Sequence, residues 1–448
     1  MVKLPLKHRH DRAILQLALP AVGSLAIDPL VSLVDTAFVG RLGAAPLGAL
    51  GVNAAVFAFF FLIFNFLAYG TTPRIGNALG RGEKEEAGKT IVQALFLALG
   101  LGSLATLMLL IFADPILGAM GASGELEEPA RQYLQIRAFA GPAVLVMIAA
   151  NGAFRGYQDT TTPLKVAFLF NGINLVLDPL FIFGFGWGIA GAAAATVIAQ
   201  WTGAALFLGL LFGTHKKAFG ISFQRPSFQE MVPLLSVGGF LFLRTVTLIF
   251  TMTFATATAA RLGVIEVAAH QIAYQLWGFF ALLVDALAIA GQSLVANHLG
   301  REDRREAREV GNRLLQWGLL LGLIIGALFL IVSPFLGRIF TPEEEILLLL
   351  GPIFLFVAVL QPLNGLVFVW DGLFMGVQVF RYLAVAMIMS ALIAIPILVM
   401  TPRMGWGLEG VWWAITAMMV LRALTLAIPW FRGSLLFLTE DRAGPRPE

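Results

Sequence analysis

The segment Asn151-Gly152-Ala153-Phe154-Arg155-Gly156-Tyr157-Gln158 is matched 220 residues later by a similar one, Asp371-Gly372-Leu373-Phe374-Met375-Gly376-Val377-Gln378. Three shorter segments repeat in the same order, the first two at 220 residues and the third at 219: Arg41-Leu42-Gly43 as Arg261-Leu262-Gly263, Leu79-Gly80-Arg81 as Leu299-Gly300-Arg301, and Gly186-Trp187-Gly188 as Gly405-Trp406-Gly407. Each match alone is weak, but four in one order indicate that the chain of 448 residues is a duplication.

The composition indicates what surrounds the two halves. Hydrophobic residues make up 58% of the chain and charged residues only 13%, so most of the surface faces lipid. The chain carries apolar stretches of the length, about 20 residues, that crosses a hydrocarbon core as a helix. Strands exposed to lipid would leave backbone groups unpaired unless they closed into a barrel, and the stretches lack strand alternation. We therefore predict an all-α integral membrane protein with twelve transmembrane helices, near residues 14–39, 50–73, 91–113, 129–150, 164–185, 190–212, 232–258, 266–293, 314–336, 346–370, 382–400 and 410–431.

Six spans in each half is an even number, so both halves enter the membrane from the same side. The repeats are then parallel and related by a pseudo-twofold axis along the membrane normal, as in one class of secondary transporters. We expect an N-terminal six-helix lobe at 1–213, a cytoplasmic linker at 214–225, a C-terminal six-helix lobe at 226–432 and a cytoplasmic tail at 433–448.

Basic residues predict the orientation. They gather at the amino terminus and in the even-numbered loops, whereas the odd-numbered loops hold mainly Arg41, Arg261, Arg338 and Arg403. Loops rich in positive charge lie on the cytoplasmic side. We therefore expect a multi-pass protein of the cell membrane with both termini in the cytoplasm. The same bias explains the basic balance of the chain without a nucleic-acid partner. No cleavable signal is evident, so the first stretch stays as a span. The absence of cysteine excludes disulfides and thiolate chemistry.

Acids inside predicted spans are candidates for function, because a buried charge is costly in a membrane. Five qualify: Asp28, Asp35, Asp178, Asp285 and Asp371. Spans one and five both run outward, which places Asp35 and Asp178 at matching depths, roughly 6 to 9 Å below their outer ends at 1.5 Å per residue. Similar arguments of depth and helix face add one phenol, one amide and one hydroxyl, from Tyr133, Asn174 and Thr196.

Such a cluster has two possible uses. Dehydration favours the protonated form of a carboxyl group, and a second carboxylate nearby favours it further, so the pair can act as a proton switch. The oxygens of Asp35, Asn174, Asp178 and Thr196 could instead coordinate Na⁺, by analogy with other hard cations. The sequence leaves H⁺ and Na⁺ open and predicts no other cofactor.

The segment Leu33-Val34-Asp35-Thr36-Ala37-Phe38-Val39-Gly40-Arg41-Leu42-Gly43, with Asn174, Asp178-Pro179 and Asp371-Gly372, resembles the MATE (multidrug and toxic compound extrusion) family, in particular its DinF-like branch. The resemblance covers all twelve spans. It implies export of organic compounds driven by inward H⁺ or Na⁺ flow, and an ion-coupling network of Asp35, Tyr133, Asn174, Asp178 and Thr196. It also implies that the first helix bends at Pro20, and proline is a physical cause of kinks.

The second half lacks the acid pair, since Asp35 corresponds to Ala255 and Asp178 to Leu398. Ion chemistry is therefore expected in the first lobe. Asp371 corresponds to Asn151, and the two either serve the transport path or join helices by hydrogen bonds. Asp28 lies two turns before Asp35 and is either a second proton station or a local partner beside Pro29.

These observations predict a monomeric antiporter that exports small organic compounds, cationic or amphipathic, across the lipid bilayer. The alternative is a lipid-linked oligosaccharide flippase of the same superfamily, which would need cations in its cavity, and Arg244 and Arg137 give it little support. An enzyme is not expected, because no zinc motif or nucleophile elbow occurs.

Overall fold

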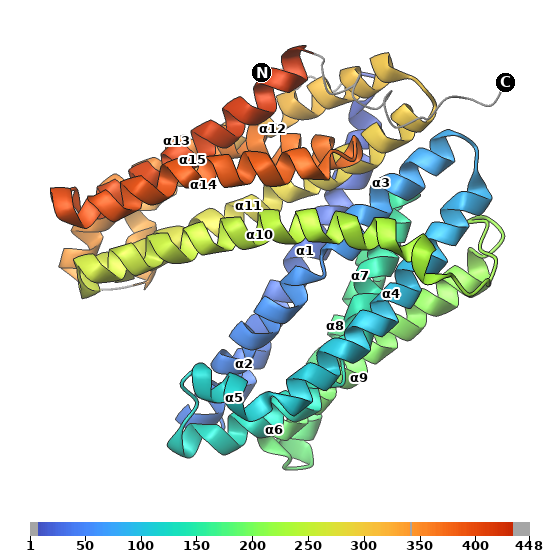
Figure 1. Cartoon of the computed structure of the whole chain (residues 1–448). Coiled ribbons are helices and arrows are strands. Elements are labelled where there is room, and N and C mark those ends of the chain that lie inside the picture. The colour runs from blue at the N-terminus through green and yellow to red at the C-terminus, as the bar shows by residue number, and fades with distance from the viewer. Residues whose placement is uncertain (1–7, 341–342, 433–448) are drawn as a thin grey trace. The chain divides into compact units, whose positions relative to one another are not determined.

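The computed structural model describes residues 8–340 and 343–432, apart from the side chains of residues 61–63, and contains helices and turns but no strand in those ranges (Figure 1). The all-α prediction is confirmed. The expected tail at 433–448 lies outside the described residues. In the first half the helices are α1 (Asp11–Gly40), α2 (Ala44–Ile63), α3 (Phe66–Gly80), α4 (Lys84–Ile111), α5 (Ala113–Ala119), η1 (Gly124–Leu126), α6 (Glu127–Ala138), α7 (Gly141–Gly156), α8 (Thr161–Pro179), η2 (Leu180–Gly184), α9 (Gly188–Gly209) and η3 (Leu210–Thr214).

The second half has fewer, longer helices: α10 (Phe228–Leu262), α11 (Val264–Gly300), α12 (Arg304–Phe340), α13 (Glu344–Gly376), α14 (Phe380–Met404) and α15 (Gly407–Arg432). Among the described residues, ten helices are long and apolar enough to span a membrane, and the bent pair α6 and α7 adds an eleventh. The predicted span at 50–73 falls on two shorter helices, α2 and α3.

Two predicted spans are broken. The span at 129–150 is divided after Ala138, where the chain bends by 51°. Pro142 has no N–H group for the carbonyl of Ala138, four residues earlier, and its ring crowds that carbonyl. The carbonyl instead accepts a hydrogen bond from the hydroxyl of Thr106 at 2.7 Å, so the break costs no backbone partner. The break between α2 and α3 has neither proline nor glycine to mark it.

The contacts divide the chain into two units. The amino-terminal unit is residues 19–238, and the carboxy-terminal unit is residues 8–18 together with 239–432, without 341–342. This differs from the expected lobes, which began at residues 1 and 226. Residues 214–225, expected to be a linker, pack within the amino-terminal unit: the ring of Tyr157 stacks on Phe219 at 3.6 Å, and its hydroxyl donates to the Phe219 carbonyl at 2.7 Å.

A buried ion pair explains why the first residues join the carboxy-terminal unit. The guanidinium of Arg313 in α12 donates to both oxygens of Asp11, at 2.6 and 2.9 Å, and the indole of Trp317 donates a third bond at 2.9 Å. Asp11 is 3% exposed. Bidentate pairs of this kind are among the stronger polar contacts, so the start of α1 is fixed to α12.

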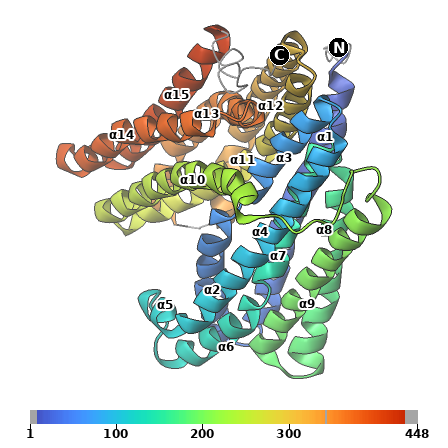
Figure 2. The same ribbon diagram turned by 45° about the vertical axis from the view of Figure 1, so that its right-hand side comes forward.

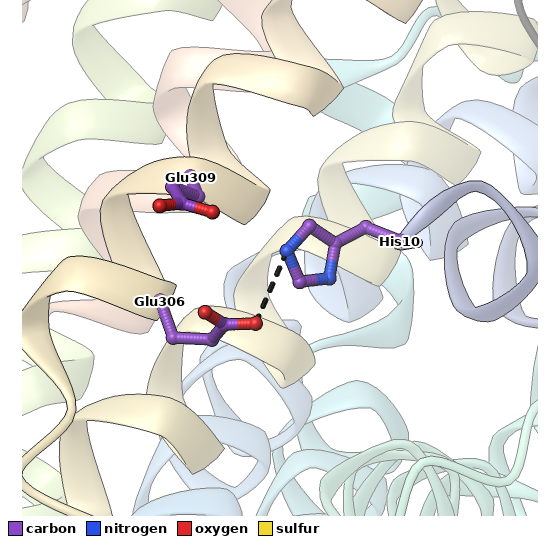
Figure 3. Close-up of side chains that lie close together, drawn as sticks. All are labelled: His10, Glu306 and Glu309. Carbon is purple, nitrogen blue, oxygen red and sulfur yellow. Dashed lines mark ion pairs between the residues drawn. The ribbon is translucent and has the colours of Figure 1, made fainter. Parts of the chain in front are cut away.

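A second cluster lies beside this pair. One nitrogen of His10 and one oxygen each of Glu306 and Glu309 lie within 4.8 Å of one another, a spacing that a metal ion could bridge (Figure 3). Arg9 already pairs with both carboxylates, at 2.7 Å for Glu306. Burial lowers the pKa of His10, so its imidazole is neutral near pH 7. We interpret the cluster as an ion-pair network that reinforces the anchor of α1.

The duplication is visible in the backbone. Left-handed residues recur at the repeat distance: Gln158 (φ 60°) with Gln378 (φ 64°), and Gly82 (φ 79°) with Glu302 (φ 60°). Such angles are uncommon outside glycine, so equivalent turns follow equivalent helices. Helix packing repeats as well: α7 contacts α3 and α4, and α13 contacts α11 and α12 (Figure 2).

Glycines allow these helices to touch through their backbones. A side-chain carbon at Gly152 would lie 2.8 Å from Ala68, and one at Gly372 would lie 2.3 Å from the carbonyl oxygen of Ala288, the corresponding residue. Without a strong hydrophobic drive between helices in lipid, such close packing holds helices together. The same glycine-dependent contact therefore joins helices in both units.

We predict that Gly372→Ala destabilises the protein, because the added methyl group collides with the carbonyl of Ala288 and both helices must separate. The expected result is a midpoint of thermal unfolding in detergent that falls by several degrees, as for an overpacking change of about 1–3 kcal/mol. Gly351→Ala is the control on the same helix, because a Cβ there meets no atom within 4 Å. Equal stability of the two variants would contradict the packing argument.

Candidate functional site

A cavity of about 600 Å³ lies within the amino-terminal unit, walled by α1, α2, α6, α7, α8 and α9. Apolar and aromatic side chains such as Phe57, Met147, Phe170 and Phe207 form part of the wall. The remainder is polar and includes six of the residues predicted to couple ions or bind substrate: Asp28, Asp35, Tyr133, Asn151, Asn174 and Thr196.

Asp178 completes the predicted set from behind the cavity wall. It lies at the end of α8, 1% exposed, and its carboxyl group is within hydrogen-bonding distance of that of Asp35 in α1. No N–H or O–H group of the described residues donates to either oxygen of Asp178 or to Oδ1 of Asp35. An ionised carboxylate has no donor, so the two groups can bond to each other only when one holds a proton.

The other members of the set surround this pair. Asn174 lies beside Asp178, one turn earlier in α8. Thr196 in α9 donates its hydroxyl hydrogen to the carbonyl of Ala192 at 2.9 Å, which leaves its oxygen lone pairs for another partner. Carbonyl, hydroxyl and carboxylate oxygens thus gather at one place, a donor set that fits a proton or a hard monovalent cation.

One residue of the site was missed in the sequence, and a second was considered there only as support for the flippase hypothesis. Asn171 donates its amide to Asp28 at 2.7 Å and so joins α8 to α1 one turn from Asn174. Arg137 lines the cavity and is 9% exposed, and its guanidinium carbon lies 5.2 Å from the ring centroid of Phe57. An arginine within a predicted span, four residues after Tyr133, could have been recognised as part of the cluster.

Asp371 is not part of this cluster. It lies in the carboxy-terminal unit, buried between two guanidinium groups, that of Arg244 at 2.6 Å and that of Arg422. Arg244 therefore forms an ion pair, and Asp371 joins α13 to α10 and α15. Its counterpart Asn151 lines the cavity of the amino-terminal unit instead. Pro20 lies in α1 two residues after Ala18, the last residue grouped with the carboxy-terminal unit.

Comparisons with known proteins agree with the duplication. The family model MatE matches the chain twice, over residues 20–180 and 241–400. Protein DETOXIFICATION 44, chloroplastic, of Arabidopsis thaliana is 39% identical over 91% of this chain and 80% of its own length. DNA damage-inducible protein F of Escherichia coli (strain K12), a DinF-like homologue, is 29% identical over 94% and 92%.

The fold agrees as well. A crystal structure described as MATE in the bent conformation superposes with a TM-score of 0.88 over 98% of both chains, at 22% identity. The two shorter helices α2 and α3 and the bent pair α6 and α7 then take the places of spans two and four. This chain belongs to the MATE family and is a multi-pass membrane transporter with twelve spans in two repeats.

Proposed function

We propose that this protein is a secondary antiporter that exports cationic or amphipathic organic compounds across the cell membrane, driven by inward flow of H⁺ or Na⁺ through the amino-terminal unit. The contact between the carboxyl groups of Asp35 and Asp178 at the wall of the cavity carries the proposal. The protein acts as a monomer with both termini in the cytoplasm, without enzymatic activity and without a cofactor other than the coupling ion.

The cavity suits this task in size and chemistry. About 600 Å³ is within the usual range for a drug-sized ligand, roughly 300–1,000 Å³. Its phenylalanines offer apolar and cation–π contacts to a flat organic cation, and its acids offer a counter-charge. A proton on Asp35 or Asp178 removes that counter-charge, so ion and substrate compete. Competition for one charge is sufficient to couple inward ion flow to outward substrate flow.

Helix α1 supplies the movement. Asp28 and Asp35 lie on α1 beyond Pro20, where the missing backbone hydrogen bond weakens the helix. When ion binding neutralises Asp35, that part of α1 no longer needs polar surroundings and bends, which reduces the cavity and expels the substrate.

The flippase hypothesis is weaker. It needs cationic side chains available to a pyrophosphate group, but the charge of Arg244 is balanced by Asp371, and Arg137 shares its cavity with the acids Asp28 and Asp35.

We predict that Asp35→Asn abolishes drug resistance conferred on an efflux-deficient host, because the nearly isosteric amide cannot take up the coupling proton or bind Na⁺ as a charge. Resistance should fall at least about ten-fold, the effect of losing 1.4 kcal/mol or more of coupling. Asp178→Asn should behave alike. Expression and thermal midpoint serve as controls for folding. Wild-type resistance in a well-folded Asp35→Asn variant would exclude Asp35 as the coupling group.

Asp371→Asn should have the opposite effect and lower stability more than transport. It leaves the charges of Arg244 and Arg422 without their carboxylate, and breaking a buried pair in this way costs about 3–5 kcal/mol. We therefore expect a clear fall in thermal midpoint, with ion-coupled efflux retained per folded molecule. Arg305→Gln is the control, because that side chain is 89% exposed and its pair with Glu309 contributes little. Uncoupled transport at unchanged stability would place Asp371 in the transport path.

The bending of α1 can be measured by a distance. The chain has no cysteine, so Leu30→Cys in α1 and Leu169→Cys in α8 introduce the only two thiols for spin labels, both at exposed positions of the amino-terminal unit. We expect the label distance to change between low and high pH, or on addition of Na⁺, and to stay constant when Pro20→Ala or Asp35→Asn is added. The same change in all three proteins would show that neither residue controls the helix.

A further inference from the structure

Arg137 places a permanent positive charge inside the cavity. It lies in α6, one turn after Tyr133, and lines the same cavity as Asp35. Its side chain is 9% exposed and packs over the ring of Phe57 at 5.2 Å. A guanidinium does not lose its proton in proteins, so this charge is present in every state of the carboxyl pair.

The charges of the site can be counted. The titratable groups that line the cavity are Asp28, Asp35, Tyr133 and Arg137, and Asp178 lies behind its wall. Asp28 is held apart, about 10 Å along α1 from Asp35, and accepts a hydrogen bond from Asn171. When Asp35 and Asp178 share one proton, their remaining negative charge is balanced by Arg137. The protonated pair is therefore neutral without any added cation.

A proton and Na⁺ place different demands on the pair. Two oxygens joined by a proton lie about 2.5–2.7 Å apart. A hard cation of calcium's size keeps each oxygen at about 2.3–2.6 Å from its centre, so two oxygens that bind it stand farther from each other. Na⁺ at the pair would also face the repulsion of Arg137, which lines the same cavity.

We propose that Arg137 is the resident counter-ion of the Asp35–Asp178 pair and makes this transporter selective for H⁺ over Na⁺ as the coupling ion. This inference rests on the proposed function and specifies H⁺ as its coupling ion. The positive charge of Arg137 thus replaces the charge that a sodium ion would supply. Removing that charge allows Na⁺ to bind to the oxygens of Asp35, Asn174, Asp178 and Thr196.

The direct test measures binding of radioactive sodium to the purified full-length protein at mildly alkaline pH, without any substrate. We expect no saturable binding by the wild type or by Arg137→Lys, which keeps the charge. Arg137→Gln and Arg137→Met should bind sodium saturably, with an affinity at least about ten-fold above any residual binding by the wild type. The reason is that charge repulsion in a partly dehydrated site is strong. Adding Asp35→Asn to Arg137→Gln should abolish that binding.

Saturable sodium binding by the wild type that is lost in Asp35→Asn would overturn the proposal, and this measurement needs no arginine variant to fold. The proposal also fails if either folded neutral variant binds no more sodium than the wild type. Ethidium flux in proteoliposomes separates the proposed export of organic cations from the proposed role of Arg137. Ethidium transport by the wild type should respond to a pH gradient, and transport by Arg137→Gln should respond also to a Na⁺ gradient. If no ethidium moves under either gradient, export of organic cations is wrong, whereas the sodium-binding result still decides the role of Arg137.

Discussion

A charge placed inside a membrane must be balanced inside the protein, and this constraint organises both units. The carboxylate of Asp371 is balanced by Arg244 and Arg422, and that of Asp11 by Arg313. In both cases opposite charges meet directly, so the contacts hold helices in place. Asp35 and Asp178 differ because they face each other, and two like charges at such a distance repel unless a proton or cation joins them. The same constraint therefore distinguishes the ion pairs that hold helices from a pair of carboxyl groups that needs a proton or cation between them.

The two repeats have the same packing but different interiors. In the amino-terminal unit, Asp35, Tyr133, Arg137, Asn174 and Asp178 form or support the cavity. The corresponding residues of the second repeat, all 0 or 1% exposed, are Ala255, Ile353, Val357, Ala394 and Leu398. One repeat thus has a dry apolar core where the other has a polar cavity. Since the glycine contacts that hold the helices are kept in both, the difference in chemistry required no change of fold.

The sequence predicted the features that depend on long or repeated patterns. The duplication, the helical class and five clustered side chains followed from spacing and depth, because hydrophobic length and helix rise are nearly invariant in a membrane. Local breaks did not follow. Pro142 ends α6, whereas Pro362, its counterpart, lies within the continuous helix α13. Proline weakens a helix at both sites, and the surrounding packing decides whether it breaks.

The grouping of residues 8–18 with the second half was equally hidden from sequence, because it depends on a contact between Asp11 and Arg313, 302 residues apart. That contact determines which part of α1 can move. Helix α1 is fixed at its start by an ion pair, carries a proline at residue 20, and bears Asp35 about four turns farther on. A helix held at one end and weakened near that end transmits a change at its other end as a bend, not as a shift of the whole helix. Under the proposed function, an ion that neutralises Asp35 would therefore act on the segment of α1 that lines the cavity.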